Sequence, residues 1–125
     1  MLRGMNVDNE FRKAEAAELR LFQRLLSTEF PGCKEISQQL GTCLVRIIDE
    51  EGSFEIKPNP LAPAALVEKT VPVEAQAKDE DGIRVHFLLF VRNGYVNELE
   101  IYKDDGSVIK RLPSPDDLEI IVLPA

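Results

Sequence analysis

The sequence predicts an α+β fold, with an N-terminal pair of helices packed on a mainly antiparallel sheet of five to six strands. Two observations point to this class. Hydrophobic residues recur with a helical period up to Gly41 and alternate with polar residues after it, and Asp-Gly or Asn-Gly follows three of the alternating segments. Because the helical pattern precedes the strand pattern, an interleaved α/β arrangement is disfavoured. A chain of 125 residues is expected to form one domain, here residues 1–125.

Residues 10–29 are predicted to form the first helix. Leu19, Phe22 and Leu26 recur at helical spacing and define an apolar stripe, while the arginine and lysine side chains can stay in water. The proline and glycine that follow are expected to end the helix, because proline disfavours helical geometry in the residue before it and glycine permits a reversal.

A second, shorter helix is predicted over residues 34–41, where Ile36 and Leu40 lie one turn apart. After it the pattern changes to that of strands. The last of these segments is apolar and is compatible with an edge strand, a central strand, or a dimer contact by edge pairing. The segments from which the sheet is expected to form are 43–49, 53–57, 71–79, 83–92, 95–103, 107–112 and 118–123.

Residues 57–71 interrupt the strand pattern with three prolines, Pro58, Pro60 and Pro63. Proline cannot donate a hydrogen bond to a sheet, so this stretch is predicted to be an extended loop, with room for one helical turn at residues 64–68. The loop is the natural place for mobility and is a candidate lid over the sheet.

The register of the central hairpin can be inferred from the two faces that it would create. A plain two-residue loop at Asn93-Gly94 would place Phe87 opposite Glu100 and so put carboxylates on the most apolar face. A three-residue connection with Gly94 as a bulge glycine would place Phe87 opposite Leu99 instead. Because a slip of one residue exchanges the faces of a strand, the cleaner apolar face favours the bulged connection. The resulting core face is Val85, Phe87, Leu89, Val91, Leu99 and Ile101.

The second face of this hairpin mixes polar and apolar side chains. Its polar members His86, Glu98, Glu100 and Tyr102 are the candidate binding residues, since no other surface of the predicted fold has so unusual a composition. The whole face is Arg84, His86, Leu88, Phe90, Val96, Glu98, Glu100 and Tyr102.

His86 and Glu100 are cross-strand neighbours in the chosen register. A carboxylate that orients an imidazole can act as a general acid and base, which would suit a small hydrolase. The same pair is also an ordinary stabilising contact on a half-solvated sheet face. No nucleophile motif of the G-x-S-x-G kind accompanies the pair, so the structural interpretation is preferred and no catalytic residue is assigned.

The composition excludes several classes of function. A formal net charge of −7 is unsuited to a nucleic-acid or anionic-membrane binder, which needs a clustered basic surface. The first residues lack the apolar region of a signal peptide, and the longest apolar runs fall far short of the ~20 residues that span a bilayer. A cytoplasmic protein is therefore expected, with an acidic surface that would attract basic partners.

Metal and cofactor sites are not expected either. Cys33 and Cys43 lie ten residues apart, which matches neither a redox pair nor a zinc-knuckle spacing, and His86 is the only histidine. The acidic clusters each precede a turn glycine and lack the alternating ligands of a calcium loop. No phosphate-binding glycine motif is present, so no cofactor is predicted.

With these features, the chain resembles small, functionally uncharacterised bacterial proteins of about this length. They begin with an amphipathic helix and end in a strand-turn-strand of the form LEIY-x-x-DG…LP. The resemblance covers the last third of the chain and the first helix. It implies an α+β fold and a bacterial cytosolic setting, and it supplies no reaction, cofactor or catalytic residue. The matching residues are Leu99, Glu100, Ile101, Tyr102, Asp105, Gly106, Leu112 and Pro113.

Three functions remain open from the sequence. The leading hypothesis is a non-enzymatic protein–protein interaction module, of an immunity or regulatory kind, that binds a basic protein partner through its acidic sheet face as a monomer or an edge-strand homodimer. The second is a small-ligand binder with the loop 57–71 as its lid. The third is the small hydrolase that would use His86 and Glu100.

Overall fold

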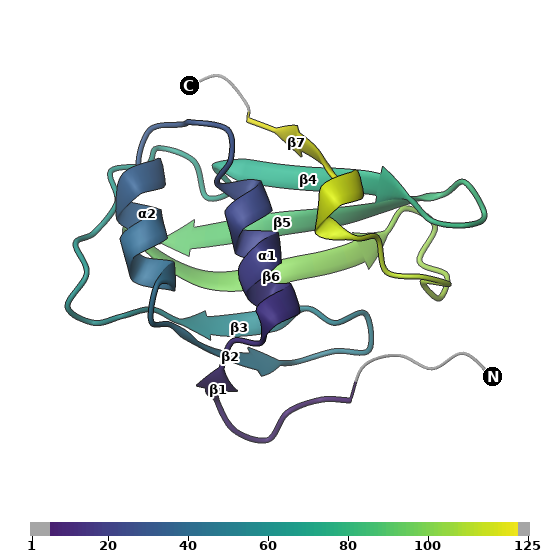
Figure 1. Ribbon diagram of the computed structural model, residues 1–125, viewed down its shortest axis with the longest axis horizontal. Helices are drawn as coiled ribbons and strands as arrows, with labels where there is room; N and C mark the ends of the chain where they lie inside the picture. The colour runs from purple at the N-terminus through teal and green to yellow at the C-terminus, as the bar shows by residue number, and fades with distance from the viewer. Residues whose placement is uncertain (1–5, 123–125) are drawn as a thin grey trace.

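The computed structural model describes residues 6–122 and confirms the α+β class. Its sheet is antiparallel throughout and has the strand order β1-β2-β3-β6-β5-β4-β7, with the helices on one face (Figure 1). The helical elements are α1 (Ala16–Leu25), α2 (Cys33–Leu40) and the 3-10 turn η1 (Pro115–Asp117). The strands are β1 (Arg12–Lys13), β2 (Leu44–Ile47), β3 (Phe54–Lys57), β4 (Val73–Lys78), β5 (Arg84–Arg92), β6 (Tyr95–Lys103) and β7 (Glu119–Ile121).

The sheet has seven strands where five to six were predicted. The two-residue strand β1 was missed, because so short a segment has no alternation to recognise. The final segment, predicted as 118–123, forms the three-residue edge strand β7 beside β4, and Leu123 lies outside the described residues. The predicted strand 107–112 does not form.

Helix α1 is shorter than predicted and presents a different stripe to the core. It begins at Ala16, where Glu15 and Glu18 form a reciprocal capping box that satisfies the first backbone amides. The buried residues are Leu21, Phe22 and Leu25, whereas Leu19 is 40 % exposed. The prediction that Leu19 belongs to the core was therefore wrong.

Helix α2 presents Ile36 and Leu40 to the core, as predicted. On the same side of the helix, one turn after Ile36, Gln39 is completely buried and bonds three backbone groups. Its amide nitrogen donates to the carbonyls of Pro63 and Gly94, and its oxygen accepts from the amide of Val96. This side chain therefore fastens α2 to the proline-rich loop and to the β5–β6 turn at once.

The β5–β6 hairpin has the predicted core face but a different register. Asn93 and Gly94 both have positive φ, so the connection is the two-residue turn that was rejected. The extra residue lies further along, at Asn97, where a bulge shifts the pairing between Phe90 and Val91. Phe87 consequently lies opposite Ile101 rather than Leu99. The bulge restores the apolar face that a regular two-residue hairpin would have lost.

The proline-rich loop contains no helical turn at residues 64–68. It runs along the end of the β5–β6 hairpin, where the amide of Ala65 donates to the carbonyl of Gly94 and the Tyr95 hydroxyl donates to the carbonyl of Ala62. Ala62 and Ala65 are buried. The loop is thus fastened to the turn and to Gln39.

Candidate functional site

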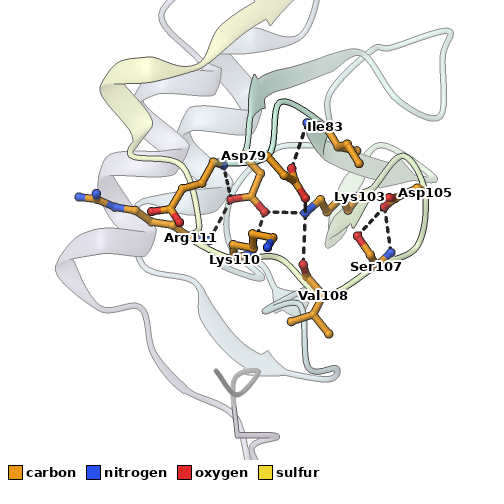
Figure 2. Close-up of polar contacts among 10 residues, drawn as sticks. Asp79, Ile83, Lys103, Asp105, Ser107, Val108, Lys110 and Arg111 are labelled. Carbon is orange, nitrogen blue, oxygen red and sulfur yellow. Dashed lines mark hydrogen bonds and ion pairs between the residues drawn. The ribbon is translucent and has the colours of Figure 1, made fainter. Parts of the chain in front are cut away.

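The most deeply buried charges of the described chain form a cluster around Lys103 (Figure 2). The Lys103 side chain is fully buried, and its Nζ donates to Asp79 Oδ2 at 2.8 Å and to Asp81 Oδ2 at 2.6 Å. A third bond, of 3.2 Å, goes to the carbonyl of Val108. Two carboxylates and one carbonyl therefore satisfy all three donors of the ammonium group.

Asp79 fastens the segment after β6 to the rest of the fold. Its carboxylate accepts from the backbone amides of Lys110, at 2.6 Å, and Arg111, at 3.0 Å. Burial alone would raise the pKa of Asp79, but the bonds from Lys103 and from the backbone amides outweigh it and hold that pKa well below its usual range. The amides of residues 110 and 111 bind this carboxylate instead of a neighbouring strand, which is why residues 107–112 are not a strand.

The sequence contained a signal for this cluster. Alternation places Lys103 on the same face as Leu99 and Ile101, so a lysine continues the buried series. A buried lysine needs an acidic partner, and Asp79 and Asp81 lie in the turn next to it. Because every member is internally paired, we assign the cluster to stability and not to function.

The second candidate region is the open face, the sheet face opposite the helices. In Figure 1 all the helical elements of the described residues lie on the near side of the sheet, so the open face is the far side. The side chains of β5 alternate between buried and partly exposed, and the partly exposed ones point to the open face. We define the open face by Arg46, Glu55, Lys57, Glu74, Gln76, Lys78, Arg84, His86, Leu88, Phe90, Arg92, Glu98, Glu100 and Tyr102.

The centre of the open face is apolar and is flanked by acids. Leu88 and Phe90 are half-buried on the central part of β5. Leu88 lies between Glu100 on β6 and Glu74 on β4, and Phe90 lies opposite Glu98. A short apolar strip thus runs along β5 with carboxylates on both sides.

Like charges meet directly on this face. Glu98 lies opposite Glu55 of β3, and Glu100 is two residues away on the same strand. Burial, together with the negative charges of Glu100 and Glu55, raises the pKa of Glu98. Glu55 has one partner in Arg46, with which it forms an ion pair. The acids therefore create a local negative potential.

His86 and Tyr102 lie directly opposite each other and their rings stack, with centroids 4.7 Å apart and 12° between the planes. His86 Nε2 is 2.5 Å from Asp104 Oδ1. The prediction that His86 pairs with Glu100 was wrong, because the two-residue turn and the bulge at Asn97 together move Glu100 opposite Leu88. His86, Glu98, Glu100 and Tyr102 nonetheless lie on one face, as predicted, whereas Val96 is buried on the core face.

The pKa of Tyr102 is raised by burial and by nearby negative charges, as that of Glu98 is. Burial first, and then the charges of Asp104, Glu74 and Glu100, raise the pKa of its hydroxyl. Tyr102 is 38 % exposed, so its ring offers both an apolar surface and a polar tip to a partner.

Basic side chains are placed toward the ends of the strands. Lys57 ends β3, Lys78 ends β4 and Arg92 ends β5, while Arg84 begins β5 opposite Lys78. At the β1 side of the sheet, the Phe11 ring lies 4.6 Å from the Arg46 guanidinium. The acids thus occupy the centre of the open face, and most of the cations lie at its margin.

Other candidate chemistry finds little support among residues 6–122. Cys33 and Cys43 are free thiols, and burial raises the pKa of Cys43 to about 11, which disfavours a reactive thiolate. Within that range no three His, Cys, Asp or Glu side chains are grouped so that they could hold a metal ion. No described helix has both the length and the apolar character needed to cross a bilayer.

The fold and the site define an antiparallel α+β domain with one helix-covered sheet face and one open, centrally acidic face. The family model of a domain of unknown function, DUF6984, matches residues 11–113, so the chain belongs to the DUF6984 family. This confirms the predicted membership in a family of uncharacterised domains. No curated protein and no solved structure matches the chain.

Proposed function

We propose that this protein is a non-enzymatic interaction module of the bacterial cytoplasm that binds a basic protein partner through its open face. The single observation that supports this most strongly is the pairing of Glu98 with Glu55 beside half-buried Leu88 and Phe90. Like charges on directly opposed strand residues destabilise a sheet, and their partial burial increases the cost. A basic partner would turn this unfavourable arrangement into a favourable one.

The arrangement resembles the anatomy of a protein interface. An apolar centre with aromatic residues and a charged surround is typical of binding surfaces, in which the centre supplies affinity and the charges supply specificity and a fast association rate. Phe90 and Leu88 would form the centre, with Tyr102 at its border. The net charge of −7 would steer a basic partner toward the protein from a distance.

A capture experiment with matched charge variants tests the proposal. The tagged protein is exposed to lysate of its own host at low and at high salt, and the captured proteins are identified by mass spectrometry. Glu98→Gln/Glu100→Gln removes two charges from the open face, and Glu29→Gln/Glu68→Gln removes two exposed charges elsewhere. We expect a basic partner that is retained at low salt by the wild type and the control and lost by the open-face variant. Equal capture by all three proteins would contradict the proposal.

A small-ligand binder is the second candidate, because one pocket of about 160 Å³ lies beneath the end of the proline-rich loop. Its lining is mainly apolar and includes Phe30, Leu66, Val67 and Val122. The pocket lies at the rim of the helix-covered side, since the core face of the sheet is already filled by helix side chains. A thermal-shift screen that finds a ligand sensitive to Leu66→Asp would favour this function over protein binding.

The hydrolase alternative required His86 and Glu100 to be paired across the hairpin. They are not paired, because His86 contacts Asp104 and Tyr102 while Glu100 lies opposite Leu88. Any acid–base chemistry would have to use His86 with Asp104. A hydrolytic activity abolished by His86→Ala but kept in His86→Gln would argue against that role, because glutamine cannot exchange protons as histidine does.

A further inference from the structure

We propose that the element bound by the open face is a basic amphipathic α-helix of the partner protein. This inference rests on the proposed function and names the kind of partner that fits it. The open face is the one broad face of the described sheet that lies away from the helices (Figure 1). Sheet faces with an apolar strip are commonly covered by helices, which bury the strip and complete a layered arrangement.

The sheet edges favour a helix over an added strand. Strand addition needs a long edge with exposed amides and carbonyls. The described edges are β1, with two residues, and β7, with three residues. Such short edges supply few backbone hydrogen bonds, whereas the open face presents side chains from strands of up to nine residues.

The dimensions of the apolar strip match a helix. Leu88 and Phe90 are two residues apart on one strand, a separation of about 6.6 Å. Apolar residues four positions apart on a helix are separated by about 6 Å along the axis. A helix aligned with β5 can therefore set one apolar side chain against Leu88 and the next against Phe90.

The acids of the open face lie where the two sides of such a helix would be. Neighbouring strands are about 4.8 Å apart, so Glu98 and Glu100 on β6 and Glu74 on β4 lie just to either side of the strip. Lysine or arginine residues that border the apolar stripe on both sides would reach these carboxylates. The partner is accordingly expected to have a narrow apolar stripe with basic residues along both borders.

Two synthetic peptides of identical composition test this inference. Both contain the same leucine, lysine and alanine residues, but in one the leucines form a single helical stripe and in the other they are scattered around the helix. Each is titrated into the full chain, with binding read by fluorescence anisotropy, helix formation by circular dichroism, and the contacted residues by amide chemical shifts.

We expect the striped peptide to bind at least ten times more tightly than the scattered one, to become helical, and to shift the amides of β5 and β6. Glu98→Gln/Glu100→Gln should weaken this binding at least fivefold, and Glu29→Gln/Glu68→Gln should leave it unchanged. Equal binding of both peptides would overturn the helix proposal and leave a purely charge-driven partner. Failure of both peptides to bind would overturn the proposed function as well.

Discussion

Glu55 and Glu98 lie directly opposite each other on neighbouring strands, with their carboxylates on the open face of the sheet. A protein selected for stability alone would place opposite charges at such positions, because cross-strand pairs contribute to sheet stability. Elsewhere in the same fold the buried charge is neutralised, since Lys103 forms ion pairs with Asp79 and Asp81. The contrast between the two regions is the main reason for assigning binding to the open face.

Glu98→Gln should stabilise the free protein near neutral pH, by about 0.2–1 kcal/mol, the usual size of a cross-strand pair interaction. The folded-state pKa of Glu98 is raised above its ordinary value, so its ionised form costs stability at neutral pH. As pH falls through that raised value, the folded protein protonates first and the cost disappears. The gain in urea unfolding free energy should therefore vanish below about pH 4.

Glu29→Gln is the control for this experiment, since Glu29 is exposed and lies outside the open face. It should leave stability nearly unchanged at every pH. A Glu98→Gln variant that is less stable than the wild type at pH 7 would mean that Glu98 is a structural residue and would contradict its role in a binding face.

Lys103→Met should destabilise the fold clearly, because it leaves the buried carboxylate of Asp79 without its cation. Exchange of the Lys110 and Arg111 amides with deuterium should become faster, since both bond that carboxylate. Lys110→Met is a matched control, because only the backbone of Lys110 takes part in the cluster and its side chain is exposed. Equal unfolding midpoints for the two variants would show that the cluster contributes little.

Asp79 should make the protein sensitive to acid. Its folded-state pKa lies below the ordinary value, so its stabilising contribution is complete above about pH 4 and is lost as pH falls further. The wild type should therefore lose more unfolding free energy between pH 6 and pH 2 than Asp79→Asn, as measured by urea titration. Parallel pH profiles for the two proteins would exclude Asp79 as the source of acid sensitivity.

Gly94→Ala should destabilise the protein more than Gly82→Ala. Both glycines have a positive φ, so alanine is strained at either position. An added Cβ at Gly94 would also lie 2.9 Å from the Cβ of Ala64 and 3.1 Å from the carbonyl oxygen of Ala65, whereas at Gly82 it would meet open space. The difference between their unfolding free energies measures how tightly the proline-rich loop packs on the turn. Equal losses of unfolding free energy in the two variants would mean that Ala64 and Ala65 can move to accommodate the added Cβ at little cost.

The sequence was sufficient for the sides of β5 and for the positions of the turns, but not for the type of the β5–β6 turn or for the side on which Val96 lies. Alternation along β5 correctly separated Val85 and Phe87 from His86 and Leu88, because one hydrophobic face suffices to orient a strand. The exact pairing could not be predicted, because the bulge at Asn97 carries no single-residue signal. A bulge is recognised only when both strands and their packing are known.

Contacts between residues far apart in the sequence explain the other differences between the predicted and the observed structure. Leu19 and Leu21 both fit an apolar helical stripe, and only the position of the sheet selects Leu21 for burial. Lys103 could have been assigned to the core by alternation, but its partner Asp79 lies 24 residues earlier in the chain. Residues 107–112 have a strand-like sequence, yet the amides of Lys110 and Arg111 are taken by that aspartate.

Zero-length carbodiimide cross-linking in host lysate tests the central claim most directly, because it joins a carboxylate only to a lysine amine that touches it. The account predicts that the tagged protein is coupled to one basic protein through Glu74, Glu98 or Glu100, located by peptide mass spectrometry, and that high salt abolishes the coupling. Coupling that instead runs through Glu29, Glu35 or Glu68 on the helix side would contradict it.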